Sequence, residues 1–154
     1  MPDSSPPSVG CTCFSLRKLT RTVSRLYDLH LAAAGLRTTQ YSLLKSIARE
    51  ALPIAELASR LATERTTLTR TLKPLIDAGW VVLKAGADSR QRIVTITDDG
   101  FGAIEAAAQA WRRAQTELED TLGMQAVREL HIQLDTALTL LTPLIERHAH
   151  AIED

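Results

Sequence analysis

The sequence predicts a mainly α-helical protein with one small β-hairpin, and three observations lead to that prediction. The 154 residues are 45% hydrophobic but only 4% aromatic, and the apolar fraction consists mainly of Ala, Leu, Ile and Val, which favours helices. Apolar residues recur at steps of three and four through long stretches of the chain. Two β-branched runs, 80–84 and 92–96, flank a short polar segment, as the strands of a hairpin do.

Four helices are predicted in the first part of the chain. Their apolar faces and the residues that interrupt them give the expected spans 14–34, 38–50, 54–61 and 64–78. Gly35 and Gly79 are expected to end the first and the fourth helix. Thr38 or Thr39 is expected to cap the second helix, and Thr63 the fourth. The stripe expected to face inward on the fourth helix is Leu68, Leu72, Leu75 and Ile76.

The hairpin and two long helices complete the predicted order. The polar turn 85–91 joins the two strands. Thr97 is expected to cap the next helix, with Asp98 and Asp99 at its positive end. Two long apolar stripes follow, separated by Gly123. Because such stripes exceed what one small core can cover, they indicate pairing of helices between two subunits.

The formal net charge is zero, but the charges are unevenly distributed. Residues 1–53 carry 7 Lys and Arg against 3 Asp and Glu, and residues 54–97 carry 7 against 4. Residues 98–154 carry 4 against 11. A basic front followed by an acidic back indicates a polyanionic partner for one part of the chain.

Two short helices followed by a hairpin, residues 54–97, form the order of a winged helix-turn-helix, whose second helix enters a DNA major groove. The polar face of that helix consists of Thr66, Thr67, Thr69, Arg70 and Lys73. Short hydroxyls suit phosphates and base edges, Arg70 can donate two hydrogen bonds to a guanine, and Lys73 suits the DNA backbone as a point charge. The alternative is an ordinary solvated helix face.

The tip of the hairpin has the sequence Asp88-Ser89-Arg90-Gln91-Arg92. Arginines on a narrow projecting loop suit a DNA minor groove, where the potential is most negative. Asp88 is expected to orient a neighbouring arginine through a bidentate pair. A surface turn with charges for solubility is the alternative, but helix, hairpin and charge distribution together favour DNA binding.

These motifs resemble the MarR (multiple-antibiotic-resistance regulator) family of bacterial winged-helix repressors. The similar residues are 66–70, Leu75, Gly79, 81–82, 88–90 and 96–100, and the order of helices extends the resemblance over 12–150. The resemblance implies that Thr66, Thr67, Thr69 and Arg70 read the major groove and Arg90 the minor groove. It also implies a homodimer on a pseudo-palindromic operator. The expected domains are a disordered tail over 1–10, a dimerisation region over 11–35 and 98–154, and a DNA-binding domain over 36–97.

The sequence departs from the family pattern at two positions. Ile96 stands where the family usually has Leu, a harmless exchange. Pro74 lies inside the predicted recognition helix, where it removes the hydrogen bond to the carbonyl of Arg70 and is expected to kink the helix.

The resemblance also implies a signal that releases DNA, either a small aromatic or phenolic ligand or the oxidation of cysteine. Candidate pocket residues are Arg17, Tyr27, His30 and Tyr41, although both tyrosines can equally pack the junction between the first two helices.

Candidate redox sensors are Cys11 and Cys13, since thiols near a helix N-terminus are more nucleophilic. A bridge across the dimer or a sulfenic acid is expected in preference to a bond between these two. The alternative is two incidental thiols.

Other classes of protein are not indicated. No apolar run approaches the roughly 18 residues of a membrane span, and no basic leader segment is present at the N-terminus. Two cysteines are too few for a secreted disulfide scaffold, so a cytoplasmic protein without a membrane partner is expected. His148 and His150 lack further ligands for a metal, and no catalytic motif appears, so neither an enzyme nor a cofactor is expected. The remaining alternative is a helical protein-interaction module without sequence-specific DNA binding.

Overall fold

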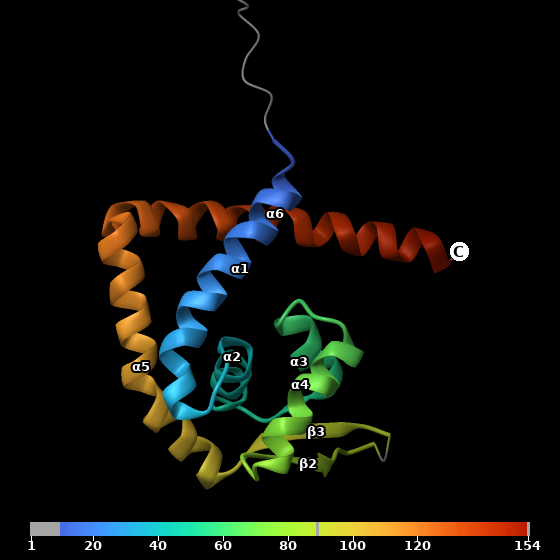
Figure 1. Ribbon diagram of the computed structural model, residues 1–154. Helices are drawn as coiled ribbons and strands as arrows, with labels where there is room; N and C mark the ends of the chain where they lie inside the picture. Colours follow the sequence, from blue (N-terminus) through green and yellow to red (C-terminus); the bar gives the residue numbers. More distant parts are fainter. Residues whose placement is uncertain (1–9, 89, 154) are drawn as a thin grey trace, which may run out of the picture. The chain divides into compact units, whose positions relative to one another are not determined.

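The computed structural model describes residues 10–88 and 90–153, with side chains described to residue 148. The described chain is mainly helical with one small antiparallel sheet (Figure 1), which confirms the predicted fold class. Nearly all of the expected tail, 1–10, lies outside the described residues. The elements are α1 (Thr12–Leu31), a 3-10 turn η1 (Ala32–Ala34), α2 (Thr38–Ile47), β1 (Leu52–Pro53), α3 (Ile54–Arg60), α4 (Arg65–Asp77), β2 (Val81–Ala85), β3 (Arg92–Ile96), α5 (Asp98–Leu122) and α6 (Met124–Glu153).

The chain divides into two compact units, residues 1–114 and 115–154. The first unit holds α1 to α4, the sheet and the larger part of α5, and the second holds the end of α5 and all of α6. Among the described residues, no helix is both long enough and apolar enough to cross a membrane.

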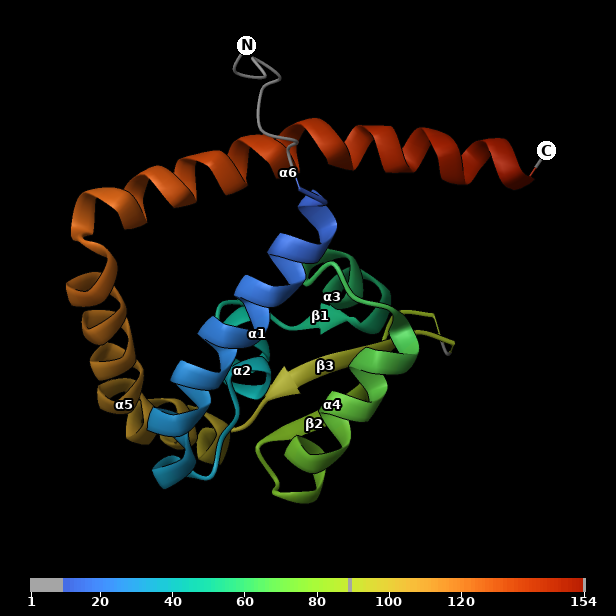
Figure 2. The same ribbon diagram turned by 45° about the horizontal axis from the view of Figure 1, so that its top comes forward.

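The sheet has the strand order β1-β3-β2, with both pairs antiparallel (Figure 2). Leu83 lies opposite Val94 in the β2–β3 pair, and Leu52 lies opposite the same Val94 in the β1–β3 pair. The hairpin is therefore where the sequence predicts it, except that β2 begins and ends one residue later than the predicted strand 80–84. The two-residue strand β1 was not predicted, because Leu52 and Pro53 form too short a run to show a strand pattern.

The core of the first unit lies where α2, α3, α4 and β3 meet. Leu44, Leu57, Leu75 and Val94 each have 0% of their surface exposed. Burial of one such side chain stabilises the folded state by about 1.5–3 kcal/mol. This core holds α4 against the sheet and leaves the opposite face of α4 to solvent.

The start of α2 is capped both by Asp28 of α1 and by Gln40 of its own first turn. The N–H and the hydroxyl of Thr38 both donate to Asp28 Oδ1, each at 2.7 Å. Arg37 is the N-cap residue of α2, and its own N–H donates to Gln40 Oε1 at 2.9 Å. The predicted cap at Thr38 or Thr39 is therefore wrong, since Thr38 is already the first helical residue. The predicted cap of α4 is also wrong, because the N-cap residue is Glu64 and not Thr63.

Thr97 joins three elements at the base of the hairpin. Its hydroxyl accepts the N–H of Gly100 at 3.1 Å, which confirms the predicted cap of α5, and donates to the carbonyl of Gly79 at 2.7 Å. Its N–H donates to the carbonyl of Trp80 at 3.0 Å. Gly79 has a φ of 75° and ends α4 as predicted. The end of α4, the start of β2 and the start of α5 are thus hydrogen-bonded through one residue.

Candidate nucleic-acid interface

The solvent face of α4 carries the residues that the sequence assigns to the major groove, together with Lys73, which it assigns to the DNA backbone. Thr66, Thr67, Thr69, Arg70 and Lys73 are exposed. Leu68, Leu72 and Leu75 are buried beneath them, as the apolar stripe predicts. Ile76, predicted to belong to that stripe, is 37% exposed and does not.

Two of these polar side chains already have partners within α4. The Thr69 hydroxyl donates to the carbonyl of Arg65 at 2.8 Å, so it keeps its lone pairs and its methyl group for an outside partner. Lys73 Nζ lies 2.9 Å from an Asp77 carboxylate oxygen in an exposed pair. Because exposed pairs of this kind contribute at most about 1 kcal/mol, a phosphate can replace Asp77 as the partner of Lys73.

Pro74 lies inside α4, as the sequence predicts, and the helix continues beyond it to Asp77. The carbonyl of Pro74 accepts the N–H of Ala78 at 3.0 Å. Pro74 itself has no N–H, so the carbonyl of Arg70 lacks its usual helical partner.

The hairpin tip is shaped by Asp88. Its Oδ1 accepts the backbone N–H of Arg90 at 3.0 Å, and its carbonyl accepts the N–H of Gln91 at 2.9 Å. The contact is thus with the backbone of Arg90, whereas the sequence suggested a pair with a guanidinium. Arg90 and Arg92 are both exposed, and Ser89 lies outside the described residues. Asp88 therefore fixes the turn that presents the two arginines.

A hollow of about 320 Å³ lies between the hairpin tip and the helix-turn-helix. Its charged lining residues are Arg65, Asp88, Arg90 and Arg92, and the rest of the lining is Pro53, Ile54, Ala55 and Gln91. The sequence had not singled out Arg65, which begins α4. Nothing in the local sequence distinguishes it, since the fold brings it to arginines some 25 positions later.

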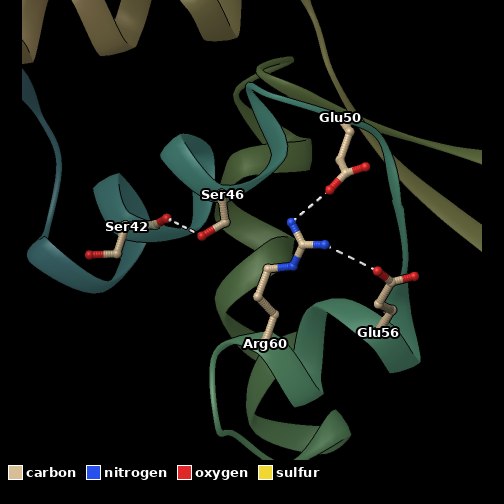
Figure 3. Close-up of polar contacts among 5 residues, drawn as sticks. All are labelled: Ser42, Ser46, Glu50, Glu56 and Arg60. Atoms are coloured by element: carbon tan, nitrogen blue, oxygen red, sulfur yellow. Dashed lines mark hydrogen bonds and ion pairs between the residues drawn. The ribbon is translucent and has the colours of Figure 1, made fainter. Parts of the chain in front are cut away.

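The link between α2 and α3 is held by an ion-pair cluster (Figure 3). The Arg60 guanidinium lies 2.8 Å from a Glu50 oxygen and 3.1 Å from a Glu56 oxygen. The hydrogen bond to Glu50 is the main cause that raises the pKa of Arg60 above its ordinary value. Because two carboxylates flank Arg60, the accessible positive charge of this region belongs instead to the arginines of α4 and the hairpin.

The candidate ligand residues separate into two groups. Tyr27 and Tyr41 are buried, and both rings contact Trp111, with centroids 6.3 Å apart in each pair. The structure thus brings the two tyrosines together around a tryptophan that the sequence had not assigned to them. Arg17 is exposed and lies ten residues before Tyr27, about 15 Å along α1. His30 is half-buried near the end of α1.

Cys11 and Cys13 are both free and exposed at the start of α1, where Cys11 is the N-cap residue. His148 Nδ1 lies 2.7 Å from the carbonyl of Leu144, and the side chain of His150 lies outside the described residues. In the part of the chain that the structure describes, no three His, Cys, Asp or Glu residues are grouped to bind a metal ion.

Known proteins are similar to this chain in sequence and in fold. Residues 34–91 match the sequence pattern of the MarR family. An uncharacterized HTH-type transcriptional regulator of Bacillus subtilis, YwoH, is 31% identical over 86 residues, which span 54% of this chain and 62% of that protein, less than two thirds of its length. The Mycobacterium tuberculosis transcriptional regulator MosR, crystallised with DNA, is 33% identical with a TM-score of 0.72, over 84% of this chain and 98% of MosR.

A further structure supports the fold alone. Wild-type MarR of Escherichia coli in its apo form has a TM-score of 0.68 at 24% identity, over 83% of this chain and 97% of that one. These relatives are transcriptional regulators rather than enzymes. With the winged-helix elements in place and nearly the whole of MosR matched, the chain belongs to the MarR family of transcriptional regulators.

Proposed function

We propose that this protein is a bacterial repressor that binds a pseudo-palindromic DNA operator as a homodimer in the cytoplasm. The observation that carries the proposal is the exposed Thr, Arg and Lys face of α4 beside an arginine-bearing hairpin tip. That MosR has been crystallised with DNA supports it.

Each part of this surface has its own task on the operator. Arg70 donates two hydrogen bonds to a guanine in the major groove, and the threonines contact base edges and phosphates. Lys73 leaves Asp77 for a backbone phosphate. Arg90 and Arg92 enter the minor groove from the hairpin, whose turn Asp88 holds.

Exposed apolar side chains support a second copy of the chain as the partner. On α1, Phe14 is 66% exposed and Leu16 and Leu19 are exposed as well. On α6, as far as residue 148, the exposed large apolar residues are Met124, Ile132, Leu138, Leu140, Leu141, Leu144 and Ile145. Exposed apolar groups of this extent mark interfaces, and closed two-fold pairing is the commonest arrangement. The excess of acidic residues over 98–154 keeps these helices away from phosphates.

Two signals are proposed to release the DNA. A small aromatic or phenolic ligand would act near Tyr27 and Tyr41, with His30 and Arg17 as polar candidates. Oxidation would act at Cys11 and Cys13, whose exposed thiols support access by peroxide. Operator binding with and without peroxide, for wild type and for the Cys11→Ser, Cys13→Ser double variant, separates the two. Identical behaviour in all four cases excludes the redox signal.

The DNA-binding proposal is tested on a duplex selected by the protein from a randomised library. Arg70→Ala is expected to reduce discrimination between the selected and a scrambled duplex by about 1–3 kcal/mol. Lys73→Ala is expected to weaken binding to both duplexes equally and to lower the salt slope by about 1. Arg113→Ala, on the exposed surface of α5, is the control for loss of one positive charge.

If neither Arg70→Ala nor Lys73→Ala alters DNA retention in a gel shift, α4 is not the reading helix. If the wild type selects no sequence at all, sequence-specific regulation by this chain is excluded, and a protein-interaction module accounts better for the fold.

A further inference from the structure

The hollow beside the hairpin tip combines charges from two separate segments of the chain. Arg65 comes from the first residue of α4, and Arg90 and Arg92 come from the hairpin tip and the start of β3. The volume of about 320 Å³ leaves room for a small hydrated anion. Figure 2 shows the β2–β3 hairpin extending beyond the short strand β1.

The lining has an excess of positive charge. The charged residues that line it carry three guanidinium groups and one carboxylate, that of Asp88. One oxygen of that carboxylate accepts the backbone N–H of Arg90. Within the described part of the chain, none of the three arginines has an ion-pair partner. Arg60, in contrast, has two carboxylates. Like charges that line one hollow repel one another, and an anion bound among them removes that repulsion.

The chemistry of the lining favours phosphate over other anions. Guanidinium presents paired N–H donors that match the oxygens of a phosphate, and several guanidiniums can share one phosphate from different directions. A DNA backbone phosphate is also the anion that passes between a major-groove helix and a minor-groove wing, since the backbone separates the two grooves.

We propose that this hollow binds one phosphate of the DNA backbone and that Arg65 is a phosphate ligand. The proposal rests on the proposed DNA-binding function and adds to it a phosphate contact from Arg65, beside the two arginines of the hairpin. Arg65 positions the protein on the duplex by linking the two reading elements through one phosphate, and it reads no base.

The test measures binding of the full-length protein to the selected and the scrambled duplex by fluorescence anisotropy at several salt concentrations. Arg65→Ala is expected to lower the magnitude of the salt slope by about 0.9, the value for one phosphate contact. It is expected to leave the ratio between the two duplexes unchanged, unlike Arg70→Ala. Arg65→Lys keeps the charge and is expected to keep the wild-type slope, as is the control Arg113→Ala.

A second measurement locates the phosphate. Uncharged methylphosphonates replace the backbone phosphates of the selected duplex one at a time. At one position in each half-site, the wild type is expected to lose about tenfold in affinity, as for a lost charged hydrogen bond, while Arg65→Ala loses less. The phosphate position is found with the wild-type protein, and each protein is compared with itself on the normal and the methylphosphonate duplex.

Three results would overturn the proposal: a wild-type salt slope in Arg65→Ala, a fall of its duplex ratio to that of Arg70→Ala, or no phosphate position at which Arg65→Ala loses less affinity than the wild type. If inorganic phosphate at constant ionic strength raises the Tm of the wild type but not of Arg65→Ala while the slopes stay equal, the hollow binds a free anion instead. A wild type that binds no duplex contradicts the proposed function itself, which is a distinguishable outcome.

Discussion

Gly100 lies at a point of close backbone approach, and the structure predicts a large cost for adding one methyl group there. A Cβ at Gly100 would collide with the carbonyl oxygen of Trp80 and would lie 2.7 Å from Ile96 Cγ1. The Trp80 carbonyl cannot simply move away, because it belongs to the backbone and accepts the N–H of Thr97. Gly100→Ala therefore forces the start of α5 away from the base of β2.

Three effects of the added methyl group set the magnitude. Overpacking costs about 1–3 kcal/mol, and the two hydrogen bonds from Thr97 to Trp80 and Gly79 are worth about 1 kcal/mol each. In the opposite direction, alanine stabilises a helix by about 1 kcal/mol relative to glycine. The expected net destabilisation is about 2–4 kcal/mol, or about 5–15 °C in Tm for a chain of this size.

Gly102→Ala is the matched control, because Gly102 lies in the same helix with nothing within 4 Å of an added Cβ. It is expected to stabilise the protein by up to about 1 kcal/mol. Urea unfolding followed by circular dichroism, at one protein concentration for all variants, measures both effects. Equal stability of Gly100→Ala and wild type, or an equal loss in both variants, would refute the close approach at Gly100.

Three other predictions concern single side chains of the first unit. Asp28→Ala removes the acceptor of both Thr38 donors and should destabilise the protein by about 1–3 kcal/mol in urea unfolding. Asp28→Asn keeps an acceptor and should lose less stability. Equal losses of stability would contradict the capping role. Thr69→Val should keep operator affinity within about tenfold, less than many lost base contacts cost. The Thr69 hydroxyl hydrogen is already bound to the carbonyl of Arg65, so valine removes only the lone pairs and keeps a methyl group in place. A loss as large as that of Thr69→Ala would show that these lone pairs accept a hydrogen bond from DNA. Burial raises the pKa of Tyr41 against a smaller opposing effect of Arg112. The unfolded chain therefore releases this proton at lower pH than the folded chain, and stability should fall as pH rises above about 10. Tyr41→Phe should reduce this fall, as measured by unfolding at alkaline pH.

Repeating local patterns made most of the fold predictable. The steps of three and four located every α-helix, and the β-branched runs located the hairpin, because both patterns act within a window of a few residues. Helix caps were harder, since the acceptor that caps α2 is Asp28, ten residues before Thr38 and on another helix. The expected end of α2 at Glu50 was three residues late. Glu50 is instead bound to Arg60 of α3, an ion pair that no local pattern reveals.

The same distinction applies to the candidate site. The amphipathic pattern separated the exposed Thr69 and Arg70 from the buried Leu68 and Leu72 correctly, because burial of one helix face is a local property. Arg65 was missed because its importance arises only when the hairpin folds back beside it.

The hydrogen bonds of Thr97 determine how a displacement of α5 reaches the DNA-binding surface. Thr97 holds the carbonyls of both Gly79 and Trp80, which are the end of α4 and the start of the hairpin. A movement of the first turn of α5 must therefore either break two hydrogen bonds, at about 1 kcal/mol each, or carry α4 and the hairpin with it. Trp111, with Tyr27 and Tyr41 against it, lies on the same helix. If the proposed function holds, a ligand that displaced Trp111 would act on α4 and the hairpin together, and so on both proposed groove contacts at once.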